Sequence, residues 1–238
     1  MQQNKISILS TRPIDESLIK EAKRLNIEID VLSFIETGPT RSIEVQQKIE
    51  NALLKSSAVV FTSMNAVDAV ANEMDGQRPD WKIYSIGNTT KQLVKKYFGE
   101  ESIAGTADSA AALAELIAEE YDSDEIFFFC GDQRRDELPD ILRSNDIPVN
   151  EIVVYQTIPV KHKIEKTYYG ILFFSPSAVE SLFSNNKVPD QTILFAIGNT
   201  TANEIKKYSN NKIIIGDEPG KENLVKKMIR YYTRTEIK

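Results

Sequence analysis

The chain has 238 residues, 41% of them hydrophobic, and its 29 basic and 35 acidic residues give a net charge of −6. This size suits one large globular domain or two modest ones, and the acidic balance without a long Lys/Arg run disfavours nucleic-acid binding through a basic face. No stretch approaches the roughly 18 consecutive apolar residues that a membrane-spanning helix needs, so we expect a chain that does not enter a bilayer.

Short apolar runs alternate with amphipathic segments from the N-terminus onward. The run Lys5–Ser10 predicts a strand, the segment Pro13–Leu25 predicts a helix, and Ile27–Ile35 predicts the next strand. The further strands predicted by this alternation are Ala58–Phe61, Ile83–Ile86, Ile126–Phe129, Ile152–Thr157, Ile171–Phe174, Ile193–Ile197 and Ile213–Ile215. The helices predicted between them are Ile43–Leu54, Ala66–Asn72, Thr89–Tyr97, Ala110–Tyr121, Asp136–Ser144, Ala178–Phe183, Thr200–Tyr208 and Lys221–Tyr232. Because apolar runs separated by helices are typical of parallel sheets covered on both faces, the sequence predicts an α/β fold.

Two motifs occur twice in the chain. Phe61–Val67 returns as Phe173–Val179, and Ile86–Thr90 returns as Ile197–Thr201. A duplicated α/β unit of this kind predicts two similar lobes with a cleft between them. The glycine spacing repeats as well, since 18 positions lead from Gly87 to Gly105 and from Gly198 to Gly216. This spacing predicts that the strand after each Asn-Thr-Thr helix ends at the equivalent position of the repeat.

A weaker repeat aligns the beginning of the chain with its middle. Ser10–Thr37 lines up with Cys130–Thr157 at a constant offset of 120 positions. Within this alignment one difference is chemical, because the aliphatic Ile35 is matched by Tyr155, which carries a phenol. The pair of equivalent strands is therefore expected to carry a phenol on one side only.

Hydroxyl-rich turns follow four of the predicted strands. In an open parallel sheet, ligands bind beyond the carboxyl ends of the strands, where the next helices offer free N–H groups and a favourable dipole to carboxylates or phosphates. The same residue types also serve as ordinary helix caps, so each turn alone has a purely structural interpretation. The four turns are Thr62-Ser63, Gly87-Asn88-Thr89-Thr90, Ser175-Pro176-Ser177 and Gly198-Asn199-Thr200-Thr201.

Groups suited to other chemistries are few. The single cysteine, Cys130, is expected to be a buried structural thiol in a reducing compartment, and the single histidine, His162, is expected on a solvated surface. One cysteine and one histidine cannot assemble the usual zinc or iron–sulfur ligand sets. The pair Arg134-Arg135, like Arg12 at the equivalent turn, is either a surface helix start or an anion contact. No Gly-x-Ser-x-Gly elbow, dinucleotide fingerprint or phosphate-binding loop occurs in the sequence.

Taken in order, these motifs resemble the uroporphyrinogen-III synthase family over nearly the whole chain. Each motif alone has little specificity, whereas the ordered set is fairly specific. Met64-Asn65 and Asn199 depart from the pattern, because proline is common at both places. The matching segments are Phe61–Ser63, Gly87–Thr90, Cys130–Pro139, Val154–Thr157, Phe173–Ser177 and Ile197–Thr201.

The resemblance implies an α/β protein with two similar lobes, each a parallel sheet flanked by helices, joined by a two-stranded β linker with a cleft between the lobes. Residues 1–35 and 167–238 would form a discontinuous first lobe, and residues 43–153 the second. The linkers would be residues 36–42 and 154–166. The repeat alone would instead suggest tandem halves, near residues 1–119 and 120–238.

The resemblance also implies a reaction. The family closes hydroxymethylbilane into uroporphyrinogen III, losing water and inverting the last pyrrole ring through a spiro intermediate, with no cofactor or metal. Tyr155 matches the family's tyrosine and would hydrogen-bond to the departing hydroxyl, unless it is only a core tyrosine. The substrate carboxylates would be bound by residues of the turns, together with the two arginines. These candidates are Arg12, Thr62, Ser63, Gly87, Thr89, Thr90, Arg134, Ser175, Ser177, Gly198, Thr200 and Thr201.

Two other functions compete with this interpretation. A non-catalytic two-lobe protein that binds a polyanionic small molecule would use the same turns without chemistry. A nucleotide-dependent enzyme is disfavoured by the missing phosphate loops. The N-terminus lacks the pattern of a signal peptide and no heptad demands a partner, so we expect a cytoplasmic, monomeric enzyme with a small-molecule substrate and no nucleic-acid or membrane partner.

Overall fold

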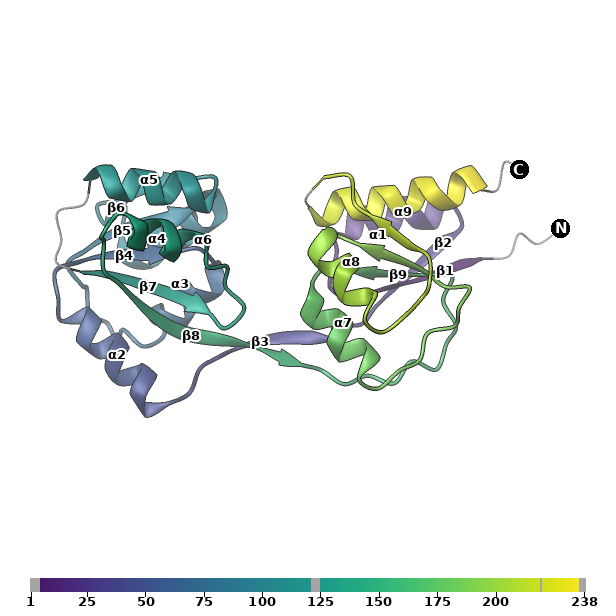
Figure 1. Ribbon diagram of the computed structural model, residues 1–238, viewed down its shortest axis with the longest axis horizontal. Coiled ribbons are helices and arrows are strands. Elements are labelled where there is room, and N and C mark those ends of the chain that lie inside the picture. The colour runs from purple at the N-terminus through teal and green to yellow at the C-terminus, as the bar shows by residue number, and fades with distance from the viewer. Residues whose placement is uncertain (1–4, 121–124, 219, 236–238) are drawn as a thin grey trace. The chain divides into compact units, whose positions relative to one another are not determined.

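The computed structural model describes residues 5–120, 125–218 and 220–235 (Figure 1). The chain forms two compact units: Met1–Glu36 together with Ile158–Lys238, and Thr37–Thr157. Both crossings between the units fall within strands, β3 (Ile35–Pro39) and β8 (Val149–Pro159), which are neighbours in one sheet. The segments expected to be linkers, residues 36–42 and 154–166, thus include most of β3 and the second half of β8.

The first unit is built on a five-stranded sheet in the order β11-β10-β9-β1-β2. Its pairings β1·β2, β1·β9, β9·β10 and β10·β11 are parallel. Different helices pack on its two faces. Helices α1 (Glu16–Arg24) and α9 (Lys221–Thr235) cover one face, while α7 (Pro176–Phe183) and α8 (Asn199–Ile205) cover the other. The strands are β1 (Ile6–Ser10), β2 (Ile27–Val31), β9 (Gly170–Phe173), β10 (Ile193–Ala196) and β11 (Ile213–Ile215).

The second unit is built on a six-stranded sheet in the order β3-β8-β7-β4-β5-β6. The pairings β7·β8, β4·β7, β4·β5 and β5·β6 are parallel. Helices α2 (Ile43–Leu53), α3 (Met64–Ala71) and α4 (Asn88–Phe98) pack on one face, and α5 (Ala110–Glu120) and α6 (Glu137–Ser144) pack on the other. The remaining strands are β4 (Ser57–Phe61), β5 (Trp81–Ile86), β6 (Ile103–Ala107) and β7 (Ile126–Gly131).

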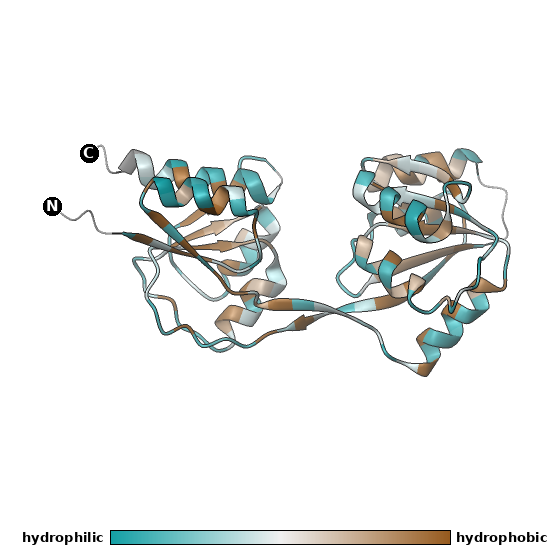
Figure 2. Cartoon of the chain, turned by 180° about the vertical axis from the view of Figure 1, so that it is seen from behind, coloured by the Kyte–Doolittle hydropathy of each residue, from teal (hydrophilic) through white to brown (hydrophobic). Residues whose placement is uncertain are grey.

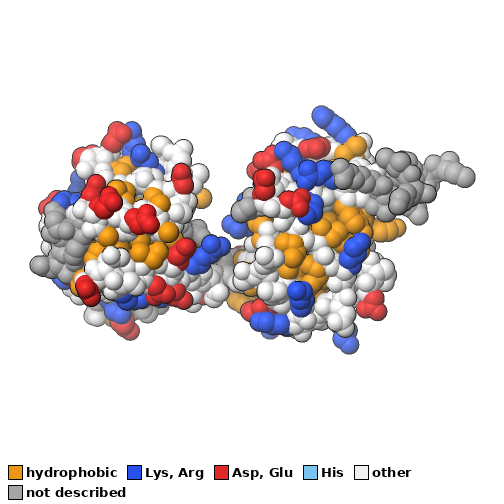
Figure 3. Space-filling model, turned by 45° about the horizontal axis from the view of Figure 1, so that its top comes forward, with side chains coloured by type: hydrophobic (Ala, Val, Ile, Leu, Met, Phe, Trp, Pro, Cys, Tyr) orange, Lys and Arg blue, Asp and Glu red, His pale blue; other side chains and the backbone are white. Residues whose placement is uncertain are grey.

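The distribution of side chains agrees with this layering. Figure 2 shows hydrophobic residues along the strands of both sheets and hydrophilic residues on the outer helices. Acidic and basic side chains are interspersed on the face of each unit shown in Figure 3. The predicted α/β fold with parallel sheets flanked by helices is therefore confirmed. Within the described residues, no helix combines the length and the apolar character needed to cross a membrane.

Two predictions about strands differ from the structure, and one predicted helix end lies outside the described residues. The single strand expected at Ile27–Ile35 is two strands, because the chain leaves the first sheet after Val31 and buries Phe34 completely in the core of the first unit. The predicted equivalence of strand ends is wrong, since Gly105 lies inside β6 whereas Gly216 follows β11. The helix expected to end at Tyr121 is described as far as Glu120, and Tyr121 lies outside the described residues.

Candidate functional site

In the second unit, parallel register gathers the carboxyl ends of four strands at one edge of the sheet. Phe61 near the end of β4 pairs with Phe129 in β7 on one side and with Ser85 in β5 on the other. Strand β8 lies beyond β7 in the same sheet. The turns that follow these strands are therefore neighbours, and they bring Thr62, Ser63 and Gly87 to the same edge as Tyr155.

Two helices begin at this edge. The Ser63 hydroxyl accepts a hydrogen bond from the Ala66 N–H at 3.3 Å and caps α3. Gly87 begins α4 with φ 74° and ψ 158°, a backbone conformation essentially restricted to glycine, and a Cβ added there would meet no atom within 4 Å. The first N–H groups of a helix have no intrahelical acceptor, so both turns present donors to a ligand. Thr62 is half-buried and Thr89 is exposed beside them.

The first unit has a similar edge. The Thr11 hydroxyl and N–H both donate to the Leu172 carbonyl oxygen, at 2.8 and 3.1 Å, which joins the end of β1 to β9. Ser175 caps α7 through the Ala178 N–H at 3.2 Å. Arg12 is exposed directly after Thr11, and among the described residues its side chain forms no ion pair. Half-buried Ser177 and Gly198 and exposed Thr200 complete the set of candidates in this unit.

Two of the candidate binding residues are buried. Thr90 is only 4% exposed and Thr201 only 2% exposed, because each is the third residue of its helix and turns toward the core. Burial makes their hydroxyls less accessible to a ligand than those of Thr89 and Thr200, which are exposed. The sequence pattern Asn-Thr-Thr does not distinguish the outward threonine from the inward one, whereas the helical period does.

Tyr155 is half-buried on β8 and packs against the cluster beneath α2, α3 and α4. Its ring lies over Gly131, the last residue of β7. Within the described part of the chain, its phenolic oxygen has no hydrogen-bond partner. The phenol is thus held by packing while its hydroxyl stays available to a ligand.

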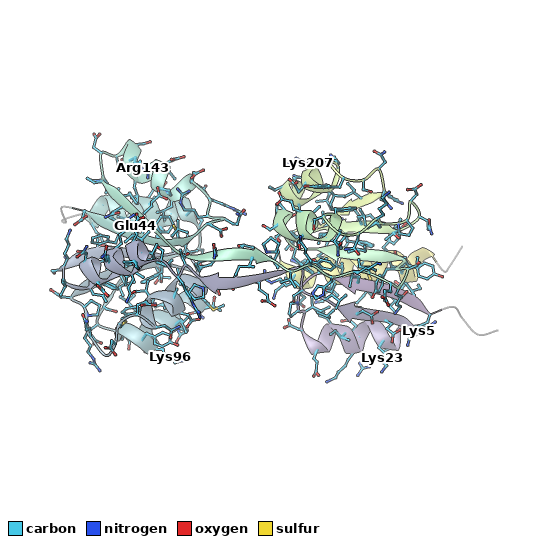
Figure 4. All side chains as sticks on the ribbon, turned by 90° about the horizontal axis from the view of Figure 1, so that it is seen from below. Lys5, Lys23, Glu44, Lys96, Arg143 and Lys207 are labelled. Atoms are coloured by element: carbon cyan, nitrogen blue, oxygen red, sulfur yellow. The ribbon has the colours of Figure 1, made fainter. Side chains whose placement is uncertain are left out.

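The two adjacent arginines after β7 have different roles. Arg134 forms ion pairs with Asp136 and with Glu151, whose side chain is 15% exposed. Glu151 is also paired with Arg143, which is labelled on Figure 4 and lies on α6. Arg134 is therefore held by ion pairs within the folded chain, and its contact with a substrate stays a prediction. Arg135 is exposed and free of ion pairs among the described residues. Of the two adjacent arginines, it is therefore the one more accessible to an anion.

The remaining singled-out side chains are structural. Cys130 is 1% exposed, and burial raises the pKa of its thiol to about 11, as expected for an inert thiol. His162 is not on a solvated surface as predicted: it is half-buried, its Nε2 lies 3.0 Å from the Ser33 carbonyl oxygen, and its ring meets Phe34 edge-on at 5.3 Å. Among the described residues, no group of three His, Cys, Asp or Glu side chains is placed to hold a metal ion.

Known proteins with similar sequences are few and distant. A porphyrin biosynthesis protein HemD from Ruminiclostridium josui is 24% identical over 93% of this chain, which spans about half (48%) of that relative. A uroporphyrinogen-III synthase from Saccharomyces cerevisiae is 23% identical, with 73% of this chain and 74% of that protein aligned.

Solved structures share the fold. The crystal structure of a uroporphyrinogen-III synthetase from Helicobacter pylori aligns with a TM-score of 0.67 at 14% identity, over 95% of this chain and 99% of that one. A mutant uroporphyrinogen III synthase from Thermus thermophilus aligns with a TM-score of 0.60 at 12% identity, over 97% and 99%. The model of the uroporphyrinogen-III synthase HemD family matches residues 16–226. Since that match covers most of the chain, this protein belongs to the uroporphyrinogen-III synthase family.

Proposed function

We propose that this protein cyclises hydroxymethylbilane to uroporphyrinogen III, with loss of water and inversion of the last pyrrole ring, in tetrapyrrole and heme biosynthesis. Membership of the family supports this reaction. The observation that points to a site is the Tyr155 phenol, which has no hydrogen-bond partner among the described residues. It lies at the edge of the sheet where β4 and β5 end in donor-rich turns. A proton donor and anion-binding turns are what this cyclisation requires.

Binding of the substrate would use the turns of each unit. The carboxylates of the linear tetrapyrrole are acceptors, and the first N–H groups of α3, α4 and α7 are donors with a favourable helix dipole. Arg12 and Arg135, which form no ion pair within the described part of the chain, add guanidinium groups after β1 and β7. Charge-assisted hydrogen bonds contribute about 1.5 to 3 kcal/mol each, so several of them offset the entropy lost when a flexible tetrapyrrole is ordered.

Tyr155 would act at the first chemical step. Its phenol donates a proton to the departing hydroxyl, the C–O bond breaks, and water leaves together with that proton. The electrophilic azafulvene that results is attacked by the substituted carbon of the last ring. This attack gives a spiro intermediate, in which the bond from that carbon to its original methylene bridge then breaks. The freed bridge forms a bond to the unsubstituted α-carbon of the inverted ring, and the proton lost from this carbon restores the Tyr155 phenol. The protein's main contribution is to hold the chain folded so that the substituted carbon, and not the unsubstituted one, reaches the azafulvene first.

Product analysis tests the proposal directly. Purified protein is incubated with freshly prepared hydroxymethylbilane, the products are oxidised, and the porphyrin isomers are separated by chromatography. We expect the type III isomer in excess over the type I isomer that forms without an enzyme. A protein that only binds a polyanion would leave the type I isomer alone, and this result would overturn the proposal.

The proposal also covers the oligomeric state of the protein and its independence from cofactor and metal. We assign catalysis to a cytoplasmic monomer, since no heptad pattern in the sequence demands a partner helix. The reaction that the resemblance implies uses no cofactor or metal, so we expect this protein to need neither. Light scattering coupled to gel filtration tests the monomer, and dialysis against a chelator before the assay tests independence from metal. A dimer mass or loss of turnover after chelation would refute the respective part.

A further inference from the structure

The Tyr155 ring occupies the space that a side chain at position 131 would need. A Cβ built on Gly131 would lie 2.4 Å from Cζ, 2.6 Å from Cε2 and 2.7 Å from the phenolic oxygen of Tyr155. Real Cβ atoms essentially never approach other heavy atoms within 3.0 Å. The phenol therefore reaches its observed position only because residue 131 has no side chain.

An irregularity of the sheet turns the ring toward that space. Cys130 pairs with Val153, but the next residue, Gly131, pairs with Tyr155, so that β8 contains one extra residue, Val154. In a regular strand, successive side chains point to opposite faces. Val154 and Tyr155 instead contact the same core cluster, as a β-bulge allows. The bulge thus re-aims the tyrosine at the carboxyl end of β7.

Asp132 binds the strand at the re-aimed tyrosine and two residues after it. Its N–H donates to the Tyr155 carbonyl oxygen at 3.1 Å, and its Oδ1 accepts from the Thr157 N–H at 2.9 Å. These two bonds fix the backbone from residue 155 to residue 157 against the turn that follows β7. The position of the phenol is then determined by three local features, namely the bulge, the missing side chain at 131 and the two bonds of Asp132.

We infer that Gly131 and Asp132 are positioning residues that orient the Tyr155 phenol for proton donation, an inference that rests on the proposed function. Neither residue needs to touch the substrate. Gly131 admits the ring, and Asp132 prevents the strand after the bulge from drifting. Holding a catalytic group in one orientation accelerates a reaction because the entropy cost of alignment is met during folding.

Gly131→Ala is the first test. The atoms that the new methyl group would meet are the far end of the Tyr155 side chain, and Gly131 does not have the positive φ that strains other residues. We therefore expect the ring to swing aside while the fold is kept. The kcat for the type III isomer should fall by about 10- to 100-fold, with KM changed by less than about threefold, because the displaced phenol donates its proton less effectively while binding is kept.

Gly105→Ala is the matched control. It is the same substitution in the same sheet, and its Cβ would lie 2.6 Å from Leu116 Cδ2 and 3.0 Å from Tyr84 Cδ1. It should lower the melting temperature at least as much as Gly131→Ala and leave kcat unchanged. If both variants lose turnover in proportion to their stability, Gly131 has only a structural role and the inference fails.

A double-mutant cycle separates positioning from general damage. If Gly131 acts through the phenol, Gly131→Ala adds no further loss of kcat in a Tyr155→Phe background. Independent, multiplicative losses would overturn the inference. Asp132 is tested by a conservative pair, since Asp132→Asn keeps an oxygen for the Thr157 N–H whereas Asp132→Ala removes it. We expect Asp132→Asn to retain most of kcat and Asp132→Ala to lose it; equal losses would contradict the assigned role.

The outcomes distinguish this inference from the proposed function. Absence of type III product with the unaltered protein refutes the function itself. Normal turnover of Tyr155→Phe removes the catalytic role of the tyrosine. A severe defect of Tyr155→Phe combined with normal turnover of Gly131→Ala leaves the proposed function standing and refutes the positioning role alone.

Discussion

The Tyr168 hydroxyl donates a hydrogen bond to the Asp30 carboxylate at 2.9 Å, which ties the segment before β9 to strand β2 of the first unit. Desolvation raises the pKa of Asp30, but the hydrogen bonds from Lys166 and Tyr168 lower it by more, so its net pKa is below the ordinary value. Desolvation and the same carboxylate raise the pKa of Tyr168.

Tyr168→Phe should therefore destabilise the protein in a pH-dependent way. The folded-state pKa of Asp30 is depressed, so its stabilisation is complete above the unfolded pKa of about 3.9 and is lost as the pH falls through the lower folded value. Because Asp30 is partly solvated, we expect a loss of about 1 kcal/mol in the free energy of unfolding at pH 7. Urea unfolding of the variant and the wild type at pH 7 and at pH 3 measures this difference in the free energy of unfolding. A difference between variant and wild type that grows toward pH 3 would contradict the linkage.

Tyr155→Phe should abolish most turnover without a cost in stability. Within the described residues the phenolic oxygen has no hydrogen-bond partner, so its removal breaks no bond of the folded chain. Loss of a general acid lowers kcat by about 10²- to 10⁴-fold. Isomer-resolved product formation and thermal unfolding are measured on the same preparation. A melting temperature several degrees lower would mean that the tyrosine has a structural role.

Arg134→Gln and Arg135→Gln should have opposite consequences. Arg134→Gln removes the ion pair to the mostly buried Glu151, which still keeps Arg143, and we expect a loss of about 1 kcal/mol in the free energy of unfolding. Arg135→Gln should leave stability unchanged and raise KM about fivefold, since one substrate carboxylate loses its partner. Chemical denaturation and steady-state kinetics on both variants check this contrast, and an exchange of the two effects would refute the assignment.

Gly87→Ala and Gly198→Ala form a matched pair across the repeat. Gly87 has φ 74°, which costs about 1 to 3 kcal/mol for a residue with a side chain, whereas Gly198 has φ −168°, which any residue adopts. In both places a Cβ has open space. We expect Gly87→Ala to lower the free energy of unfolding by that amount and Gly198→Ala to leave it unchanged or slightly raised. Equal effects in urea titrations would contradict the difference in backbone conformation.

Cys130 should resist alkylation in the folded protein. Its thiol is buried and its pKa is raised to about 11, so little of the reactive thiolate exists at pH 8. Mass spectrometry of iodoacetamide-treated samples should show slow modification in buffer and rapid modification in concentrated urea. Rapid labelling of the native protein would show that the thiol is accessible.

The sequence predicted the layers and the turns because both depend on local patterns. Alternating apolar runs and helices specify parallel sheets, and Ser63 and Ser175 cap helices as their residue type suggests. The burial of Thr90 and Thr201 follows from the helical period and could have been predicted from it. The ion pair of Arg134 could not, because its partner Glu151 lies 17 residues away in the sequence. The bulge at Val154 also escaped prediction, since its signal is a pairing between two strands and not a pattern in either one.

The discontinuous first unit has a consequence for the order in which the chain acquires structure. Strand β1 lies between β2 and β9, and its residue Ile8 pairs with Ile29 of β2 and with Gly170 of β9. During synthesis the first two strands emerge early, yet their sheet lacks β9 and β10 until residues 170–196 have been made. The second unit, residues 37–157, is complete before that point and is able to fold first. The nascent N-terminal segment must therefore stay open, with its apolar strand edge unpaired, while more than half of the protein is still being translated.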